Sequence, residues 1–286
     1  MKLFTHTVLW LLASALLCGC TFPQWDRGTS SKQPPTPVSF FSTQTGQVDF
    51  KPKALPINRP VQQTFEADPV LYAALSGDGR SMVFITETNG RSRVILGPLD
   101  PSHGKPPQAV SHLEGHITSP ALSYHGRWLA FRGTAFDVKG DIYLLDLASE
   151  NNPPIPGPVP LPVAGDGSFP SISPDGNRMA FVSRRVDPGG DLFVLDLTTG
   201  AIRQATHGPA RDFQPCWSRD ARTLYFSRLV PPAPANEGKE RAEAISVYRI
   251  LANDFGTMPF PLTSSPHVAY QPMVTASHLY FHQWTP

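Results

Sequence analysis

The chain has 286 residues, with 24 Lys and Arg against 23 Asp and Glu, and only 16% of its residues are charged. This near-balance argues against a nucleic-acid-binding protein, because such proteins carry a basic excess or a basic stripe. The 32 prolines and 22 glycines leave little room for helices of ordinary length. A hydrophobic content of 40%, with 17 phenylalanines, is nevertheless enough for a sizeable core. We therefore expect one globular domain built of short strands and turns.

An apolar segment occupies residues 8–17 near the start of the chain. A helix that spans a bilayer needs about 20 apolar residues, so this shorter segment is typical of the central region of a secretory signal. The residues that follow it, Leu17, Gly19 and Cys20, resemble the bacterial lipobox. That resemblance implies that the chain is cleaved before Cys20 and that diacylglycerol is attached to the Cys20 thiol. An ordinary signal peptide cleaved near Ala15 is the alternative.

The lipobox divides the chain into three predicted parts. Residues 1–19 form the signal peptide, residues 20–37 form the lipidated cysteine and a tether, and residues 38–286 form the folded domain. The tether is rich in Ser, Thr, Pro and Gln, a composition that buries too little apolar surface to fold. Under the usual lipoprotein sorting rule, Thr21 after the cysteine favours the outer membrane, with the protein facing the periplasm.

A repeat organises the rest of the chain. Its centre is a Ser followed by a short polar turn, and a Phe comes eight residues after the Ser. The copies begin at Ser76, Ser123, Ser173 and Ser218, and their phenylalanines are Phe84, Phe131, Phe181 and Phe226. Because each Phe has the same place in its repeat, we expect the four to form the core between repeats. A shortened fifth copy covers residues 271–281.

Each repeat has the pattern of antiparallel β structure. Asp-Gly turns supply the positive φ that tight hairpins need, and strands are predicted on both sides of them, as in residues 170–173 and 178–182. Two further strands, such as residues 190–197 and 201–206, complete the unit. Four strands in 45–50 residues match one blade of a β-propeller.

The segment Phe169–Phe181, followed by residues 191–197, resembles the PD40 (WD40-like) repeat of the TolB propeller family. The resemblance covers most of residues 65–286. It implies a β-propeller and partners among envelope proteins, such as a component of the Tol-Pal system or a peptidoglycan-associated lipoprotein. Two departures are expected here: the lipid anchor, and the lack of the amino-terminal α/β domain that precedes the propeller of TolB.

The two ends of the domain are expected to share one blade. The last repeat supplies only two strands, which would leave an exposed sheet edge, while residues 38–42 and 47–51 are two strand candidates without a repeat. Joining them predicts an all-β propeller of five four-stranded blades. Residues 231–244 and the proline-rich residues 152–162 are predicted to be protruding loops.

The repeated turns are the first place to look for chemistry. Carboxylates in tight turns can bind calcium, but calcium needs 6 to 8 oxygen ligands, and one Asp per turn is what local hydrogen bonding requires. We therefore interpret the polar and glycine positions of the turns as structural. These positions are Asp78, Gly79, Gly126, Asp175, Gly176 and Asp220. No metal, cofactor or catalytic residue is predicted.

The favoured function is a non-enzymatic scaffold that is held to an envelope membrane by Cys20 and binds another envelope protein. A monomer is expected, and nucleic acid is not expected to bind. The alternative is a protein that binds or hydrolyses carbohydrate or peptidoglycan fragments in the propeller channel. That alternative requires acidic or His side chains that converge in the channel, and the sequence does not single out such a group.

Overall fold

The structure is a computed structural model that describes residues 38–42, 48–49, 70–100, 106–135, 138–148, 159–160, 166–231, 244–263, 268–275 and 278–284. These residues form strands and turns, and among them no helix has the length and hydropathy needed to cross a bilayer. The strands make five antiparallel sheets of four strands each. The all-β class and the propeller arrangement predicted from the repeat are confirmed.

Each of the first four sheets is built from consecutive strands, whereas the fifth joins both ends of the chain. The first sheet contains β3 (Val70–Leu75), β4 (Ser81–Thr88), β5 (Arg91–Pro98) and β6 (Gln108–Glu114). The second contains β7 (Ile117–Leu122), β8 (Trp128–Gly133), β9 (Asp141–Asp146) and β10 (Val159–Pro160). The third contains β11 (Gly167–Ile172), β12 (Arg178–Ser183), β13 (Asp191–Asp196) and β14 (Ile202–Gln204). The fourth contains β15 (Arg211–Trp217), β16 (Thr223–Val230), β17 (Ala244–Leu251) and β18 (Phe260–Pro261). The fifth contains β19 (Val268–Val274), β20 (Leu279–Trp284), β1 (Val38–Ser42) and β2 (Val48–Asp49).

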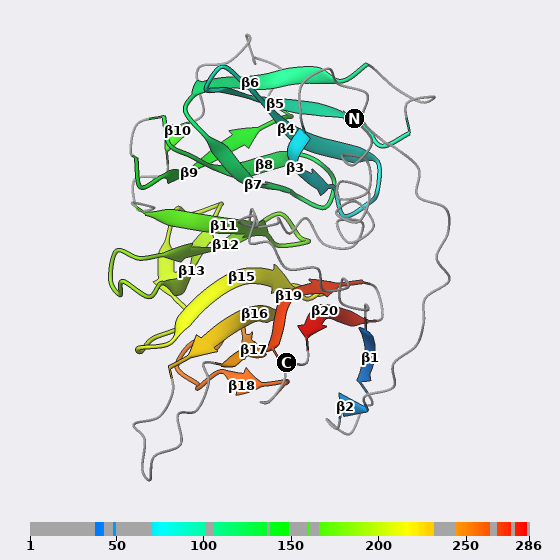
Figure 1. Cartoon of the computed structure of the whole chain (residues 1–286). Coiled ribbons are helices and arrows are strands. Elements are labelled where there is room, and N and C mark those ends of the chain that lie inside the picture. The colour runs from blue at the N-terminus through cyan, green and yellow to red at the C-terminus, as the bar shows by residue number, and fades with distance from the viewer. Residues whose placement is uncertain are drawn as a thin grey trace.

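The fifth sheet has the mixed origin that the sequence predicted. β1 pairs antiparallel with β20, with Val38 opposite Phe281 and Phe40 opposite Leu279. In Figure 1 the blue strand β1 accordingly lies beside the red strand β20. This pairing covers an edge of β20 that would otherwise be open to other chains.

Apolar side chains fill the spaces between successive sheets. Each of the second to fifth sheets packs its first strand against the preceding sheet: β7 against β3 and β4, β11 against β7 and β8, β15 against β11 and β12, and β19 against β15 and β16. The four repeated phenylalanines are at most 2% exposed. Phe131, Phe181 and Phe226 belong to apolar clusters that span two sheets, so their predicted place between repeats is confirmed, whereas the cluster of Phe84 contains residues of the first sheet alone. A fully buried Phe side chain contributes about 1.5–3 kcal/mol through removal of its surface from water.

A β-bulge recurs in the first strand of four sheets. The only sign of it in the sequence is the proline that follows each bulged residue. The strand pairing shifts in β7, β11, β15 and β19 at a residue with positive φ that precedes a Pro. These residues are Ser119, Phe169, Gln214 and Gln271, with φ of 52–56°. Because a Pro cannot donate to the strand ladder, a bulge is one of the few places in a sheet that accept it.

The predicted loop over residues 152–162 is wrong in part, because Val159–Pro160 form the short strand β10. Pro160 pairs with Tyr143 at the edge of the second sheet, where the missing N–H of a proline costs little. Residues 231–243 connect β16 to β17, as expected for an insertion within the fourth sheet. Most of that insertion lies outside the described residues.

Candidate binding site

The Ser of each repeat organises its turn by a fixed set of hydrogen bonds. In all four copies its hydroxyl oxygen accepts a bond of 2.9 Å from the main-chain N–H five residues later. In the three copies that contain the Asp, the hydroxyl donates to that carboxylate over 2.5–2.7 Å. We call the end of the propeller that carries these turns the turn face.

The turn carboxylates Asp78, Asp175 and Asp220 are held by their own turns. Each accepts a second bond, of 3.0–3.1 Å, from the main-chain N–H two residues later. For Asp220, the bonds from Ser218 and from the Arg222 N–H lower the pKa of the carboxyl. Among the described residues, no group of three or more His, Cys, Asp or Glu side chains could hold a metal ion.

The fourth turn departs from the others at the residue with positive φ. Gly79, Gly126 and Gly176 have φ of 70–72° at this position, where glycine pays no steric penalty. The fourth repeat places Ala221 there instead, with a φ of 56° and 2% exposure. A side chain other than glycine in this region costs roughly 1–2 kcal/mol.

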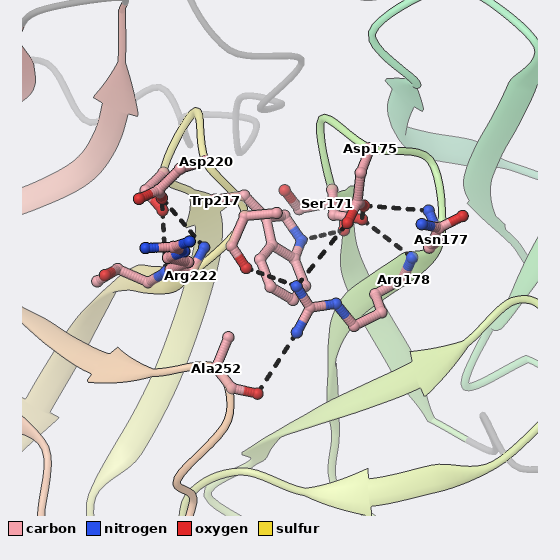
Figure 2. Close-up of polar contacts among 12 residues, drawn as sticks. Ser171, Asp175, Asn177, Arg178, Trp217, Asp220, Arg222 and Ala252 are labelled. Carbon is pink, nitrogen blue, oxygen red and sulfur yellow. Dashed lines mark hydrogen bonds and ion pairs between the residues drawn. The ribbon is translucent and has the colours of Figure 1, made fainter.

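Arg178 connects the third sheet to this strained turn. Figure 2 shows its side chain reaching from β12 toward the fourth sheet. The guanidinium donates to the main-chain oxygen of Ala221 over 2.5 Å and to that of Ala252 over 3.4 Å. It also lies over the Trp217 ring, 4.8 Å from the centroid, and the Trp217 indole N–H donates to the Ser171 oxygen over 2.9 Å. These contacts hold the third and fourth sheets together at the turn face.

A shallow depression of about 440 Å³ opens to solvent at this boundary. Its lining contains two guanidinium groups and no carboxylate. The lining residues are Arg178, Ala221, Arg222, Leu251, Ala252 and Asn253. Two cations beside the apolar side chain of Leu251, which is 50% exposed, suit a ligand that is both anionic and apolar.

The equivalent place in the second sheet shows what the depression lacks. There, Arg127 of the turn forms an ion pair with Asp146 of β9, with 2.9 Å between Nη2 and Oδ2. This pair raises the pKa of Arg127 and lowers that of Asp146. Arg222 has the turn position of Arg127, and Leu251 has the strand position of Asp146. The fourth sheet thus keeps the cation of the pair and replaces the acid with leucine.

A second titratable cluster lies at the opposite end of the third and fourth sheets. Asp212 and Arg228 form a buried ion pair with bonds of 2.6 and 2.8 Å. Asp191, which is 1% exposed, accepts a 3.0 Å bond from Gln204 at Oδ2, while its Oδ1 is buried without a hydrogen bond. Burial, together with the neighbouring charge of Asp212, raises the pKa of Asp191 to about 6. This cluster joins two blades and is not open to a ligand.

The remaining candidates from the sequence lie outside the described residues. Leu17, Gly19 and Cys20 are among them, so lipid attachment remains a prediction. Sequence reasoning also missed Ala221, Arg222 and Leu251 as a group. A residue-by-residue alignment of the repeats would have found them, because Ala221 replaces a glycine and Leu251 replaces an acid.

The fold is shared with solved propeller proteins. A putative TolB from Agrobacterium tumefaciens matches with a TM-score of 0.52 and 20% identity, over 83% of this chain and 73% of that protein. TolB from Acinetobacter baumannii matches with a TM-score of 0.54 and 14% identity, over 88% of this chain and 61% of that protein. The chain has a TolB-like β-propeller fold.

The TolB-like propeller also occurs within larger proteins. A puromycin-hydrolyzing peptidase from Mycobacterium tuberculosis matches with a TM-score of 0.51 and 15% identity, over 87% of this chain but only 43% of that protein. No protein-family model matches the chain, and neither does any curated protein. Because the identities are low, these matches concern the fold alone.

Proposed function

We propose that this protein is a lipid-anchored scaffold of the bacterial cell envelope, which binds another envelope protein at the turn face of its propeller. The observation that carries the proposal is the depression between the third and fourth sheets. It combines the exposed Leu251 with Arg222 at a position where the second sheet has a closed ion pair. An open apolar and cationic surface on a rigid set of blades is suited to protein binding.

The lipobox supports the anchored part of the proposal. Two or three acyl chains attached at Cys20 would hold the protein stably to a membrane without a spanning helix. Thr21 favours the outer membrane and the periplasmic side. The TolB-like fold supports a partner class that includes Tol-Pal components and peptidoglycan-associated lipoproteins, with the protein itself as a non-catalytic monomer.

The anchor is tested with the variant Cys20→Ser. Cells that express the wild-type protein or this variant are labelled with a palmitate analogue and separated into membrane and soluble fractions. We expect label and membrane association for the wild type and the loss of both for Cys20→Ser. Membrane association without label would overturn lipidation at Cys20.

The scaffold role is tested by cross-linking in cells, followed by purification and mass spectrometry of the bound proteins. We expect one dominant envelope protein, recovered again when the cross-link is made from its own side. If no specific protein is recovered and muropeptides instead raise the thermal stability of the purified protein, the channel-binding alternative replaces the scaffold.

A further inference from the structure

We propose that the depression at the turn face binds an acidic side chain of the partner protein beside the Arg222 guanidinium and the Asn253 main-chain N–H, with an apolar neighbour in contact with Leu251. The proposal rests on the scaffold role and specifies the chemistry of its partner. An acidic side chain, rather than a carboxyl terminus, is the chosen occupant because the equivalent group in the second sheet is a side-chain carboxylate.

The main chain places the two sites in the same geometry. In the second sheet the N–H of Leu147 donates to the Arg127 oxygen over 2.7 Å. In the fourth sheet the N–H of Ala252 donates to the Arg222 oxygen over 2.8 Å in the same way. The Arg222 side chain therefore starts from the same place beside its partner strand as the Arg127 side chain does, and a carboxylate that lies against Leu251 can accept from its guanidinium.

The second donor of the Asp146 site is also present. Asp146 Oδ1 accepts a 3.0 Å bond from the N–H of Ala148, two residues further along the chain. The corresponding N–H belongs to Asn253, which lines the depression. Within the described part of the chain, neither this N–H nor the Arg222 guanidinium has a hydrogen-bond acceptor. Both donors of the closed site are thus available to a carboxylate from outside.

The nearest acid in the same turn does not fill this role. Asp220 Oδ1 is held by the Ser218 hydroxyl at 2.6 Å and by the Arg222 main-chain N–H at 3.1 Å. Figure 2 shows Asp220 bonded within its own turn, on the other side of Trp217 from Asp175. The charge of the Arg222 side chain also acts on Asp220 and lowers the pKa of its carboxyl.

The probe is the capped peptide acetyl-Leu-Asp-Leu-amide, added to the full chain in detergent while ¹⁵N NMR signals are followed. Since a single exposed ion pair is weak, we expect a Kd on the order of 1 mM. The Asn253 amide and Arg222 Nε signals should shift together and saturate. The same peptide with Asn in place of Asp should bind about three- to fivefold more weakly. The peptide acetyl-Leu-Asn-Leu with a free carboxyl terminus tests the other source of a carboxylate.

Three variants make the test specific. Arg222→Gln should weaken binding of the Asp peptide to the level of the Asn peptide, whereas Arg80→Gln, at the same turn position of the first sheet, should leave it unchanged. Leu251→Asp should also weaken binding, because it restores the internal pair. The proposal would be overturned by the lack of a saturable shift at about 10 mM Asp peptide or by equal binding of both capped peptides. Stronger binding of the free-terminus peptide, or equal losses in Arg222→Gln and Arg80→Gln, would also overturn it.

Cross-linking in cells separates this inference from the scaffold role. Reduced recovery of the partner with Arg222→Gln but not with Arg80→Gln supports both. Equal recovery with both variants overturns the acidic-side-chain site and leaves the scaffold role standing. Failure to recover any partner with the wild-type protein counts against the scaffold role, whatever the peptide result.

Discussion

The Arg178 guanidinium of the third sheet donates a 2.5 Å hydrogen bond to the main-chain oxygen of Ala221, the strained residue of the fourth turn. The same arginine covers Trp217 and reaches Ala252. One side chain therefore joins two blades and borders the depression that we assign to partner binding. This boundary contributes both to the stability of the propeller and to the proposed binding site, and a substitution there can change one of these properties without the other.

The variant Ala221→Gly should stabilise the protein by about 1 kcal/mol, because glycine adopts the φ of 56° without steric cost. Urea unfolding measures the change. The reverse substitution, Gly79→Ala, is the matched control: its φ is 70° and no atom lies within 4 Å of the added Cβ. It should lose a similar amount. A loss of stability in Ala221→Gly would mean that the Ala methyl packs more favourably than its strain costs.

The variant Arg178→Met should destabilise the protein by about 1–3 kcal/mol, because two main-chain oxygens lose a charged donor while the apolar contact with Trp217 is kept. The midpoint of urea unfolding measures it. Arg203→Met, on the exposed face of the outer strand of the same sheet, is the control and should change stability by less than about 0.5 kcal/mol. Equal effects of the two variants would contradict a structural role for the bridge.

Much of this fold could be predicted because its signals are local and repeated. The Ser-centred turns and the phenylalanines recur at fixed offsets, and each reports a hydrogen-bond or packing need of its own blade. The strand β10 was missed because two residues beside prolines carry no periodicity. The bulges were missed because a residue before Pro ordinarily adopts extended backbone, whereas Phe169 and Gln214 have positive φ.

The binding site was harder to predict than the fold. It arises from differences between repeats, namely Ala221 for glycine and Leu251 for an acid, whereas a repeat is recognised by what its copies share. The pairing of Asp212 with Arg228 was also missed, because the equivalent pairs in the second and third sheets, Ile117 with Gly133 and Gly167 with Ser183, carry no charge.

The variant Arg228→Met should destabilise the protein by about 3–5 kcal/mol, because it leaves the fully buried Asp212 carboxylate without its cation. The double variant Asp212→Asn with Arg228→Met should lose clearly less than the sum of the two single variants. The Met side chain can keep the contacts with Phe226 and Tyr248, whose rings lie 5.3 and 5.2 Å from the guanidinium carbon. Additive losses in a double-mutant cycle would show that the two residues are not coupled.

The variant Asp191→Asn should make the protein more stable at neutral pH and remove a pH dependence. Burial and the Asp212 charge raise the pKa of Asp191 from 3.8 to about 6. The folded state therefore holds a proton that the unfolded state releases, so wild-type stability falls as pH rises from about 4 to about 6. Asn keeps the acceptor for Gln204, and the gain at pH 7.5 should be about 2–3 kcal/mol, with almost none at pH 4. Asp196, at the other end of β13, has a pKa lowered by bonds from the Thr199 and Thr198 N–H groups, so Asp196→Asn should change stability in the opposite direction at neutral pH. Thermal unfolding of the three proteins between pH 4 and pH 8 measures these differences, and parallel curves for the wild type and Asp191→Asn would contradict a raised pKa.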